Sequence, residues 1–332
     1  MREILNRFRD EKDILLGVCD ATRMAWGYDS QKTTHMPEGS FLPGGKKRSD
    51  READVIVFGN HIAPRVKTET PFVNRDPERR INPSAVMPSA KSVIVIGVRG
   101  YAAPAPPDTE PRGRVAAIAV GEDYHKTAKA LLLELVERLG DSNEYRIFAD
   151  AGHLDERALA VRAGLGFIGK NGMVISKKFG SSFHIGYMLT DARQGDGSSV
   201  LQKRKIEEPS PCLACGDCRR CVDACPGGAL GDAGFNYRKC VSYLTQKKKP
   251  PTAEEAAVMG KWLYGCDICR DVCPFNTHAE RCAAEEAYPL LADCVNITDE
   301  EFDRRYGNSA LHWRGAEIFR RNAFIAMNNW QN

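Results

Sequence analysis

The stretch CGDCRRCVDACP at residues 215–226 decides how this chain is built. Its cysteines follow the spacing C-x2-C-x2-C-x3-C-P of bacterial ferredoxins, in which three closely spaced thiolates bind one [4Fe–4S] cluster and the cysteine before proline binds a second one. The two-residue gaps wrap the loop around a corner of the cluster, with backbone N–H groups facing the sulfurs. The sequence therefore predicts an iron–sulfur domain with two clusters.

A second run, CDICRDVCP at residues 266–274, repeats this spacing without its first cysteine, because Leu263 stands where that cysteine would be. The second cluster then needs a fourth ligand, and Cys240 is the natural candidate as the one cysteine between the two runs. Cys273 crosses back to the first cluster. The predicted ligands are Cys215, Cys218, Cys221 and Cys273 for the first cluster, and Cys225, Cys240, Cys266 and Cys269 for the second.

Zinc is the competing interpretation, since CxxC pairs also bind zinc. The two Cys-Pro endings and the tandem repeat favour clusters instead. Cys212 also forms a CxxC pair with Cys215, but the Cys-Pro ending fixes the frame that begins at Cys215. The chain has twelve cysteines, eleven of them after residue 211, and this clustering is unlike a secreted disulfide framework. The remaining cysteines, Cys19, Cys282 and Cys294, are interpreted as ordinary thiols.

Upstream of the cysteines, strands alternate with helices, which predicts an α/β layer structure. The predicted strands are ADVIVFG (53–59), AKSVIVIGV (90–98), YRIFAD (145–150) and MVIS (173–176), and the predicted helices are DYHKTAKALLLELVERLG (123–140) and LDERALAVRAG (154–164). The first of these helices has apolar residues at a spacing of three to four, and Gly140 is placed to end it. A polar linker is predicted at 192–211.

The stretch GLGFIGK at residues 164–170 matches both the G-x-G-x-x-G motif and most of a P-loop. Both motifs need a strand before and a helix after, so that phosphate lies at the helix N-terminus. Here a helix precedes and a strand follows, and Asn171 stands where a P-loop has Ser or Thr. We therefore reject nucleotide binding and expect a tight turn that allows the backbone or a ligand to approach closely.

The 332 residues carry a formal net charge of +3, which by itself demands neither a nucleic-acid nor a membrane partner. The longest apolar runs are too short to span a bilayer, and the charged start MREILNRFRDEKD resembles no leader, so a cytoplasmic location is expected. Basic residues that could contact phosphate are Lys247, Lys248, Lys249, Arg314, Arg320 and Arg321. A run of three lysines is most often a solvated turn.

Two helices are predicted after the cysteines. Thr298 and Glu301 form a capping-box signal, and an apolar stripe predicts a last helix at about 314–329, whose apolar face must pack on the body or on a partner. The resulting division is an α/β domain at 1–195, a ferredoxin-like domain at 196–285 and a helical segment at 286–332.

Taken together, these motifs resemble the epoxyqueuosine reductase family, which is related to reductive dehalogenases. The resemblance covers roughly residues 80–330. The matching stretches are SAVMPSAKSVIVIG (84–97), GEDYHK (121–126), DAGHLDERALAVRAGLGFIGKNGMVIS (150–176), CGDCRRCVDACP (215–226), KCVSYLT (239–245), YGCDICRDVCPFN (264–276) and RGAEIFRRNAFIAMNN (314–329).

The resemblance implies a nitroreductase-like α/β domain that holds cobalamin beside two [4Fe–4S] clusters. The clusters would receive electrons from an external ferredoxin- or flavodoxin-type donor and reduce the cobalt to Co(I), and the enzyme would remove the epoxide oxygen of a modified tRNA nucleoside. The family's proposed proton donor, the aspartate of D-x-G-P-x-x-E-R, corresponds to Asp150, which could otherwise cap the next helix. The implied cobalamin-binding residues are Tyr124, His125, Gly169, Lys170 and Asn171.

Two features depart from the family pattern. His153 stands where the family has proline, and it is either a second catalytic group, a cobalt ligand or substrate contact, or an ordinary residue at the start of a helix. The chain ends at Asn332, where many relatives continue into helical repeats that help hold tRNA, and this weakens the tRNA expectation. The alternatives are a cytosolic cobalamin-dependent reductase of a small molecule, such as an organohalide, and a non-catalytic electron carrier or cobalamin-binding protein.

Overall fold

A four-stranded antiparallel sheet lies at the centre of the N-terminal half, with strands in the order β1-β4-β9-β6. Its strands are β1 (Leu15–Asp20), β4 (Ser92–Arg99), β9 (Phe183–Thr190) and β6 (Tyr145–Ala149). The computed structural model describes residues 1–22, 24, 54–58, 61–65, 77–107, 110–150, 152–193, 215–231, 234–277 and 279–331.

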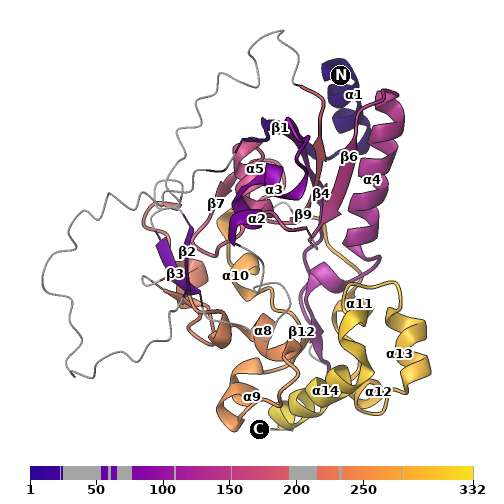
Figure 1. Cartoon of the computed structure of the whole chain (residues 1–332). Helices are drawn as coiled ribbons and strands as arrows, with labels where there is room; N and C mark the ends of the chain where they lie inside the picture. Colours follow the sequence, from indigo (N-terminus) through magenta and orange to yellow (C-terminus); the bar gives the residue numbers. More distant parts are fainter. Residues whose placement is uncertain are drawn as a thin grey trace, which may run out of the picture.

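Helices cover both faces of this sheet (Figure 1). On one face, Ile94 and Ile96 of β4 pack with α1 (Arg2–Lys12) and α4 (Tyr124–Leu139). On the other face, Val93 and Val95 pack with α5 (Glu156–Arg162). All four side chains are fully buried, which explains why the strand is an unbroken apolar run and does not alternate with polar residues.

The long helix α4 begins and ends where the sequence predicts. The side chain of Asp123 caps it by accepting a hydrogen bond from the backbone N–H of His125, and Gly140 ends it in the left-handed conformation, with φ +58°. Two short helices, α2 (Pro77–Ile81) and α3 (Pro83–Val86), precede β4. A separate hairpin pairs β2 (Asp54–Phe58) with β3 (His61–Arg65), so the strand predicted at 53–59 is confirmed.

The central position of β9 in the sheet was not expected from the sequence. The predicted strand at 173–176 does form, as β8 (Val174–Ile175), but it pairs with β7 (Phe167–Ile168) in a short hairpin outside the main sheet. β9 pairs with β4 on one side and with β6 on the other, which makes the whole sheet antiparallel. Glycine and histidine within FHIGYMLT lower its strand propensity, and tertiary packing overrides that preference.

The glycine-rich stretch between α5 and β7 is a tight turn, as predicted. Gly164 has φ +80°, and a Cβ atom on Gly166 would lie 2.2 Å from the carbonyl oxygen of Ile175. Because the crowding atom belongs to the backbone of β8, it has no room to move aside. The turn therefore brings two backbone segments into contact and does not cradle a phosphate.

Gly166→Ala is expected to destabilise the protein by about 1–3 kcal/mol, because the added methyl group must displace backbone. Gly231→Ala is the matched control, since a Cβ atom there would meet no heavy atom within 4 Å, and it should change stability by less than about 0.5 kcal/mol. The urea midpoint of each variant measures the effect. Equal midpoints for the two variants would contradict the close approach at Gly166.

The cysteine-rich part and the C-terminal helices lie below the sheet in Figure 1. Their elements are α7 (Arg220–Asp223), β10 (Leu230–Gly231), β11 (Gly234–Phe235), α8 (Val241–Gln246), α9 (Ala253–Met259), β12 (Trp262–Tyr264), α10 (Ile268–Asp271), α11 (Ala284–Ala287), α12 (Leu291–Val295), α13 (Asp299–Tyr306) and α14 (Gly315–Gln331). Short 3-10 turns, η1 (Ala117–Ala119), η2 (Tyr237–Lys239), η3 (Pro274–Asn276) and η4 (His312–Arg314), connect several elements. Thr298 caps α13 as predicted, by accepting from Glu301 N.

A segment of the predicted first domain packs within the C-terminal half. β5 (Arg114–Val115) pairs in parallel with β12. Ala103, Val115 and Val120 share one core with Leu291 of α12 and Phe319 of α14. The predicted domain boundary at residue 195 therefore stays a prediction. In space, residues 114–120 of the predicted first domain contribute to the core of the C-terminal half.

The sequence left open whether the apolar face of the last helix, α14, packs on the protein itself or on a partner. Its apolar residues Phe319, Ala323 and Ala326 are buried against the body of the protein, so its apolar face packs within the chain. Residues 194–211 of the predicted linker, and Cys212, lie outside the described residues. Among the residues that are described, no helix has both the length and the apolar character needed to cross a bilayer.

Candidate active site and iron–sulfur centres

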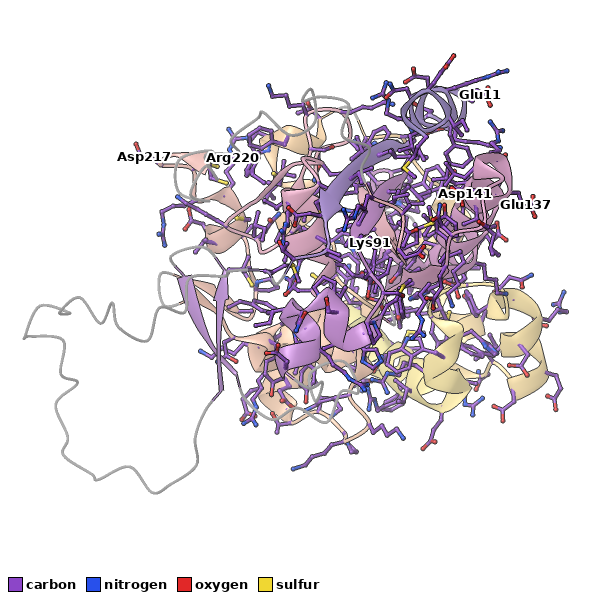
Figure 2. All side chains as sticks on the ribbon, turned by 45° about the horizontal axis from the view of Figure 1, so that its top comes forward. Glu11, Lys91, Glu137, Asp141, Asp217 and Arg220 are labelled. Carbon is purple, nitrogen blue, oxygen red and sulfur yellow. The ribbon has the colours of Figure 1, made fainter. Side chains whose placement is uncertain are left out.

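Four of the predicted ligands surround one cavity of about 230 Å³. They come from the loop before α7, from α7 itself and from the Cys-Pro turn after α10, and they are Cys215, Cys218, Cys221 and Cys273. The loop keeps its shape through backbone hydrogen bonds, such as Cys218 N to Cys215 O at 3.1 Å. Figure 2 shows Asp217 and Arg220, which belong to this loop and helix, at the outer edge of the molecule.

The other four predicted ligands form a second group, in which Cys240, Cys266 and Cys269 lie deeper than the cysteines of the first group. The pKa of Cys266 is raised to about 12, mainly by burial and in part by the neighbouring thiols Cys240 and Cys225. Burial also raises the pKa of Cys269, with contributions from Cys266, Cys240, Cys221 and Cys225. Cys240, Cys266 and Cys269 therefore hold their protons until a metal centre supplies compensating positive charge.

The spacing of these thiols bears on the zinc alternative. Within the described ranges, no three His, Cys, Asp or Glu side chains come close enough to hold a single metal ion. Zinc draws its thiolates to about 2.3 Å from one ion, whereas the four thiolates around a [4Fe–4S] cluster each bind a different iron and stand farther apart. Four thiols that line one cavity fit a cluster, in which each iron takes one thiolate.

The side chain of Asp267 connects the loop of the second cysteine group to η1. Its Oδ2 accepts a hydrogen bond from Ala117 N at 2.6 Å, and its Oδ1 lies 3.4 Å from Arg270 Nη2. Asp267 and Arg270 are both buried. Sequence reasoning missed this ion pair, because a carboxylate inside a cysteine motif carries no signal that it is buried.

Asp150, the predicted proton donor, lies directly after β6 in the left-handed conformation, with φ +54°. Its Oδ2 lies 3.2 Å from His125 Nε2, and His125 Nδ1 lies 2.5 Å from Asp123 Oδ1. Asp155 is the residue that caps α5, by accepting from Arg157 N and Ala158 N. The interpretation of Asp150 as the cap of that helix is therefore wrong.

The charge of His125 is set by its two carboxylate neighbours. Burial lowers its pKa, but the hydrogen bonds to Asp150 and Asp123, together with their negative charge, outweigh burial and raise the pKa overall. The two carboxylates therefore favour the protonated form of His125, although it lies in the first turn of a helix. This arrangement links a partly exposed carboxylate, Asp150, to a second proton-carrying group.

Tyr124 lies between two histidines in a stacked arrangement. Its ring centroid is 4.0 Å from that of His125 and 4.3 Å from that of His184 on β9. Burial, with the charges of Arg270 and His125, lowers the pKa of His184 to about 4, so this histidine is neutral. His184 is a site residue that the sequence did not suggest, because the strand that carries it was not predicted.

His153 lies on the loop between β6 and α5 and is partly buried. Its neighbour Gly152 packs against Tyr187, whose hydroxyl would lie 2.0 Å from a Cβ atom at residue 152. The same hydroxyl accepts from Leu154 N at 3.3 Å. The loop is thereby held to β9, and a catalytic role for His153 stays a prediction.

The predicted cobalamin contacts Gly169, Lys170 and Asn171 lie in the turn between β7 and β8, beside the first cysteine group. Lys170 Nζ donates to the carbonyl oxygens of Gly216 at 2.6 Å and Cys218 at 3.1 Å. Lys170 and Asn171 both line the cavity formed by the cysteines. The role of these three residues toward cobalamin stays a prediction. In the structure, Lys170 contacts the cysteine loop, and Asn171 Oδ1 accepts a hydrogen bond from Met173 N.

Most of the basic residues predicted to contact phosphate instead make contacts within the protein. Lys247 is buried and pairs with Glu255 Oε2 at 2.5 Å, so it is not part of a solvated turn. Arg321 donates to the carbonyl oxygen of Lys247, and Arg320 pairs with Asp299 at 2.8 Å. Arg314 stacks on Trp313, with its guanidinium carbon 3.5 Å from the ring centroid.

The fold and the two cysteine groups define an iron–sulfur oxidoreductase with a double-cluster domain. Residues 214–276 match the family model of a 4Fe-4S double cluster binding domain, and residues 80–151 match that of epoxyqueuosine reductase QueG. The chain is 36% identical to the epoxyqueuosine reductase of Lactococcus garvieae over 274 residues, which are 78% of this chain and 74% of that protein. This chain belongs to the epoxyqueuosine reductase family.

Solved structures support the same assignment. The epoxyqueuosine reductase of Streptococcus thermophilus superposes with a TM-score of 0.76 at 29% identity, covering 100% of this chain and 82% of that one. An epoxyqueuosine reductase crystallised with an epoxyqueuosine-modified tRNA-Tyr stem loop superposes with a TM-score of 0.74 at 27% identity, covering 99% and 81%. The expected family and fold class are confirmed.

Proposed function

We propose that this chain reduces the epoxide of epoxyqueuosine in tRNA. The epoxide oxygen leaves as water when the substrate takes up two electrons and two protons, so the site must supply both. The observation that carries the proposal is the pairing of Asp150 with His125, within the same chain as the eight clustered cysteines. The substrate itself comes from the relatives, one of which was crystallised with the modified stem loop.

Asp150 is the proposed donor of a proton to the departing oxygen. Its side chain is 43% exposed, which leaves it accessible to a substrate, while His125 fixes one of its oxygens. A carboxylic acid positioned in this way typically contributes a factor of about 10²–10⁴ to the rate. His125, held in turn by Asp123, is the proposed positioning residue that can also return a proton to Asp150 after turnover.

Electrons are proposed to enter through the first cysteine group, which lies at the outer edge of the molecule beside Arg220 (Figure 2). Cys240, Cys266 and Cys269 of the second group lie deeper in the protein, and Cys269 is close enough to Cys221 of the first group for their charges to interact. A small iron–sulfur or flavin protein of low potential is the proposed external donor.

Cobalamin is proposed to bind between the sheet and the cysteine-rich part. Two buried side-chain atoms there, Ser182 Oγ and Arg270 Nε, have no hydrogen-bond partner among the described residues. Both lie near His184: Ser182 is two residues before it on the chain, and the charge of Arg270 lowers its pKa. The corrin ring carries carboxamide groups that would satisfy such atoms, and its cobalt would supply electrons to the substrate in a pair.

An exposed aromatic side chain suggests how the nucleic acid is held. Trp313 is 43% exposed, its Nε1 donates to the Tyr264 hydroxyl at 2.9 Å, and Arg314 covers one ring face. Burial raises the pKa of Tyr264 to about 12 with a contribution from the charge of Asp150, so this aromatic group lies near the proposed acid. Stacking on such a platform is how proteins hold unpaired bases.

Trp313→Ala is therefore expected to weaken binding of the modified stem loop roughly tenfold, because one stacked base contributes about 1–3 kcal/mol. Phe324→Ala is the control, since Phe324 is an exposed aromatic residue on α14, with a side chain 62% exposed. Fluorescence anisotropy with a labelled stem loop gives the two dissociation constants. Equal constants for both variants would exclude the platform.

The function is tested with anaerobically reconstituted protein, cobalamin, a low-potential reductant and tRNA that carries epoxyqueuosine. Mass spectrometry of the digested nucleosides should show loss of one oxygen atom. Protein that retains both clusters and cobalamin but leaves the nucleoside unchanged would contradict the proposal. In that case, turnover of an organohalide would favour a small-molecule reductase, for which the departure at His153 is the supporting observation. Electron transfer without any turnover would favour a carrier.

The pairing of His125 with two carboxylates predicts a pH dependence of stability. The pKa of His125 is raised in the folded state, so its ion pairs with Asp150 and Asp123 stabilise the folded protein fully below the unfolded pKa of about 6.5. This stabilisation is lost as the pH rises through the folded-state pKa. The difference in Tm between the native protein and His125→Gln should therefore be largest near about pH 6 and shrink toward alkaline pH. A difference that stays constant with pH would argue against a protonated His125.

A further inference from the structure

The carboxamide of Asn171 is a buried polar group that the proposed chemistry does not use. Asn171 lies in the turn between β7 and β8, is only 9% exposed, and lines the cavity formed by the first cysteine group. Its Nδ2 is buried and has no hydrogen-bond partner among the described residues. Buried amide N–H groups are nearly always paired, so a partner is expected in the assembled protein.

The orientation of this carboxamide is fixed by its other end. Asn171 Oδ1 accepts a hydrogen bond from the backbone N–H of Met173 at 3.2 Å, a role that only the oxygen can take. Nδ2 must then occupy the opposite position. Since the side chain lines the cavity, the two N–H groups of Nδ2 are the donors that Asn171 can offer to whatever fills it.

Two cationic side chains also line the cavity, but neither replaces this donor. Lys170 is committed to the carbonyl oxygens of Gly216 and Cys218. Arg220 is exposed, so water screens its charge. Among the described residues that line this cavity, Asn171 is therefore the buried neutral side-chain donor.

We propose that Asn171 Nδ2 donates a hydrogen bond to a sulfur of the [4Fe–4S] cluster held by Cys215, Cys218, Cys221 and Cys273, and that this bond raises the reduction potential of that cluster. The inference rests on the proposed ligand set of the first cluster. Reduction adds one electron, whose negative charge spreads onto the sulfurs, so a donor stabilises the reduced form more than the oxidised form. For Asn171, this assignment takes the place of the cobalamin contact that the family resemblance implies.

The test is an EPR-monitored redox titration of the holoprotein with dithionite, comparing the native chain with Asn171→Leu and Asn171→Asp. Leucine removes the donor at similar size, and aspartate replaces it with an acceptor. In each variant the reduction potential of the first cluster should fall by up to about 59 mV, which is a tenfold change in a one-electron equilibrium. The second cluster is the internal control, and its potential should not change.

The outcomes distinguish three roles: an effect of Asn171 on the reduction potential, a role of Asn171 in keeping the cluster bound, and a wrong set of ligands for the first cluster. Unchanged potentials for both clusters would overturn the proposal, and a simultaneous loss of cobalamin would return Asn171 to that cofactor. If Asn171→Leu loses iron, the reduction potentials of Asn171→Asp test the proposal instead. Loss of iron in both variants would also overturn the proposal. Cys215→Ala tests the ligand set by itself: if that variant keeps both cluster signals, the assignment of the first cluster is wrong whatever Asn171 does.

Discussion

Replacing Asp150 with asparagine is expected to lower turnover roughly 10²–10⁴-fold while both clusters and the fold remain. Asparagine has the same shape and can still pair with His125, but it has no proton to give to a departing oxygen. It also tolerates the left-handed backbone that residue 150 adopts, with φ +54°, better than other residues do. The loss should therefore reflect chemistry, and it should appear in kcat more than in KM.

The control for this variant is Glu137→Gln, which removes one negative charge at an exposed position on α4 (Figure 2). Iron content, the visible spectrum and single-turnover conversion of modified tRNA are measured for both variants. Retained turnover by Asp150→Asn, with clusters and cobalamin bound, would remove Asp150 from the acid role. His153→Pro, which restores the family residue, then becomes the variant of interest, since a second donor would lie three residues from the first.

Cys240→Ala is expected to lower iron from about eight to about four atoms per chain, because it removes one ligand of the second cluster. This variant is the most informative of the eight, since Cys240 lies outside both cysteine motifs and was assigned because it lies between them. Burial raises the pKa of Cys240, and the charge of Cys225 adds to this effect, as expected for adjacent ligands of one cluster. Turnover should be lost together with the cluster.

Cys282→Ala is the matched control, a half-buried cysteine outside the two proposed ligand groups. It should keep the full iron content and both EPR signals. An unchanged iron content in Cys240→Ala would show that another side chain completes the second cluster. Cys212, which lies outside the described residues, would then be the next cysteine to replace.

Local patterns in the sequence determined much of this protein. The C-x2-C-x2-C-x3-C-P run was enough to indicate two clusters, because ligand spacing within one loop is a local property. The caps at Asp123 and Gly140 placed both ends of α4 for the same reason. The order of helix, glycine turn and strand around Gly164 excluded phosphate binding without any tertiary information.

Only the tertiary structure decided which distant segments meet. β9 became a central strand, and with it His184 joined the site, because burial against both helix layers outweighed the weak strand propensity of its residues. Ala117 contacts Asp267, and β5 pairs with β12, because the segment 114–120 packs in the C-terminal core. Spacing along a chain specifies a ligand loop or a helix cap, whereas pairing across many residues depends on the apolar surface that the whole fold buries.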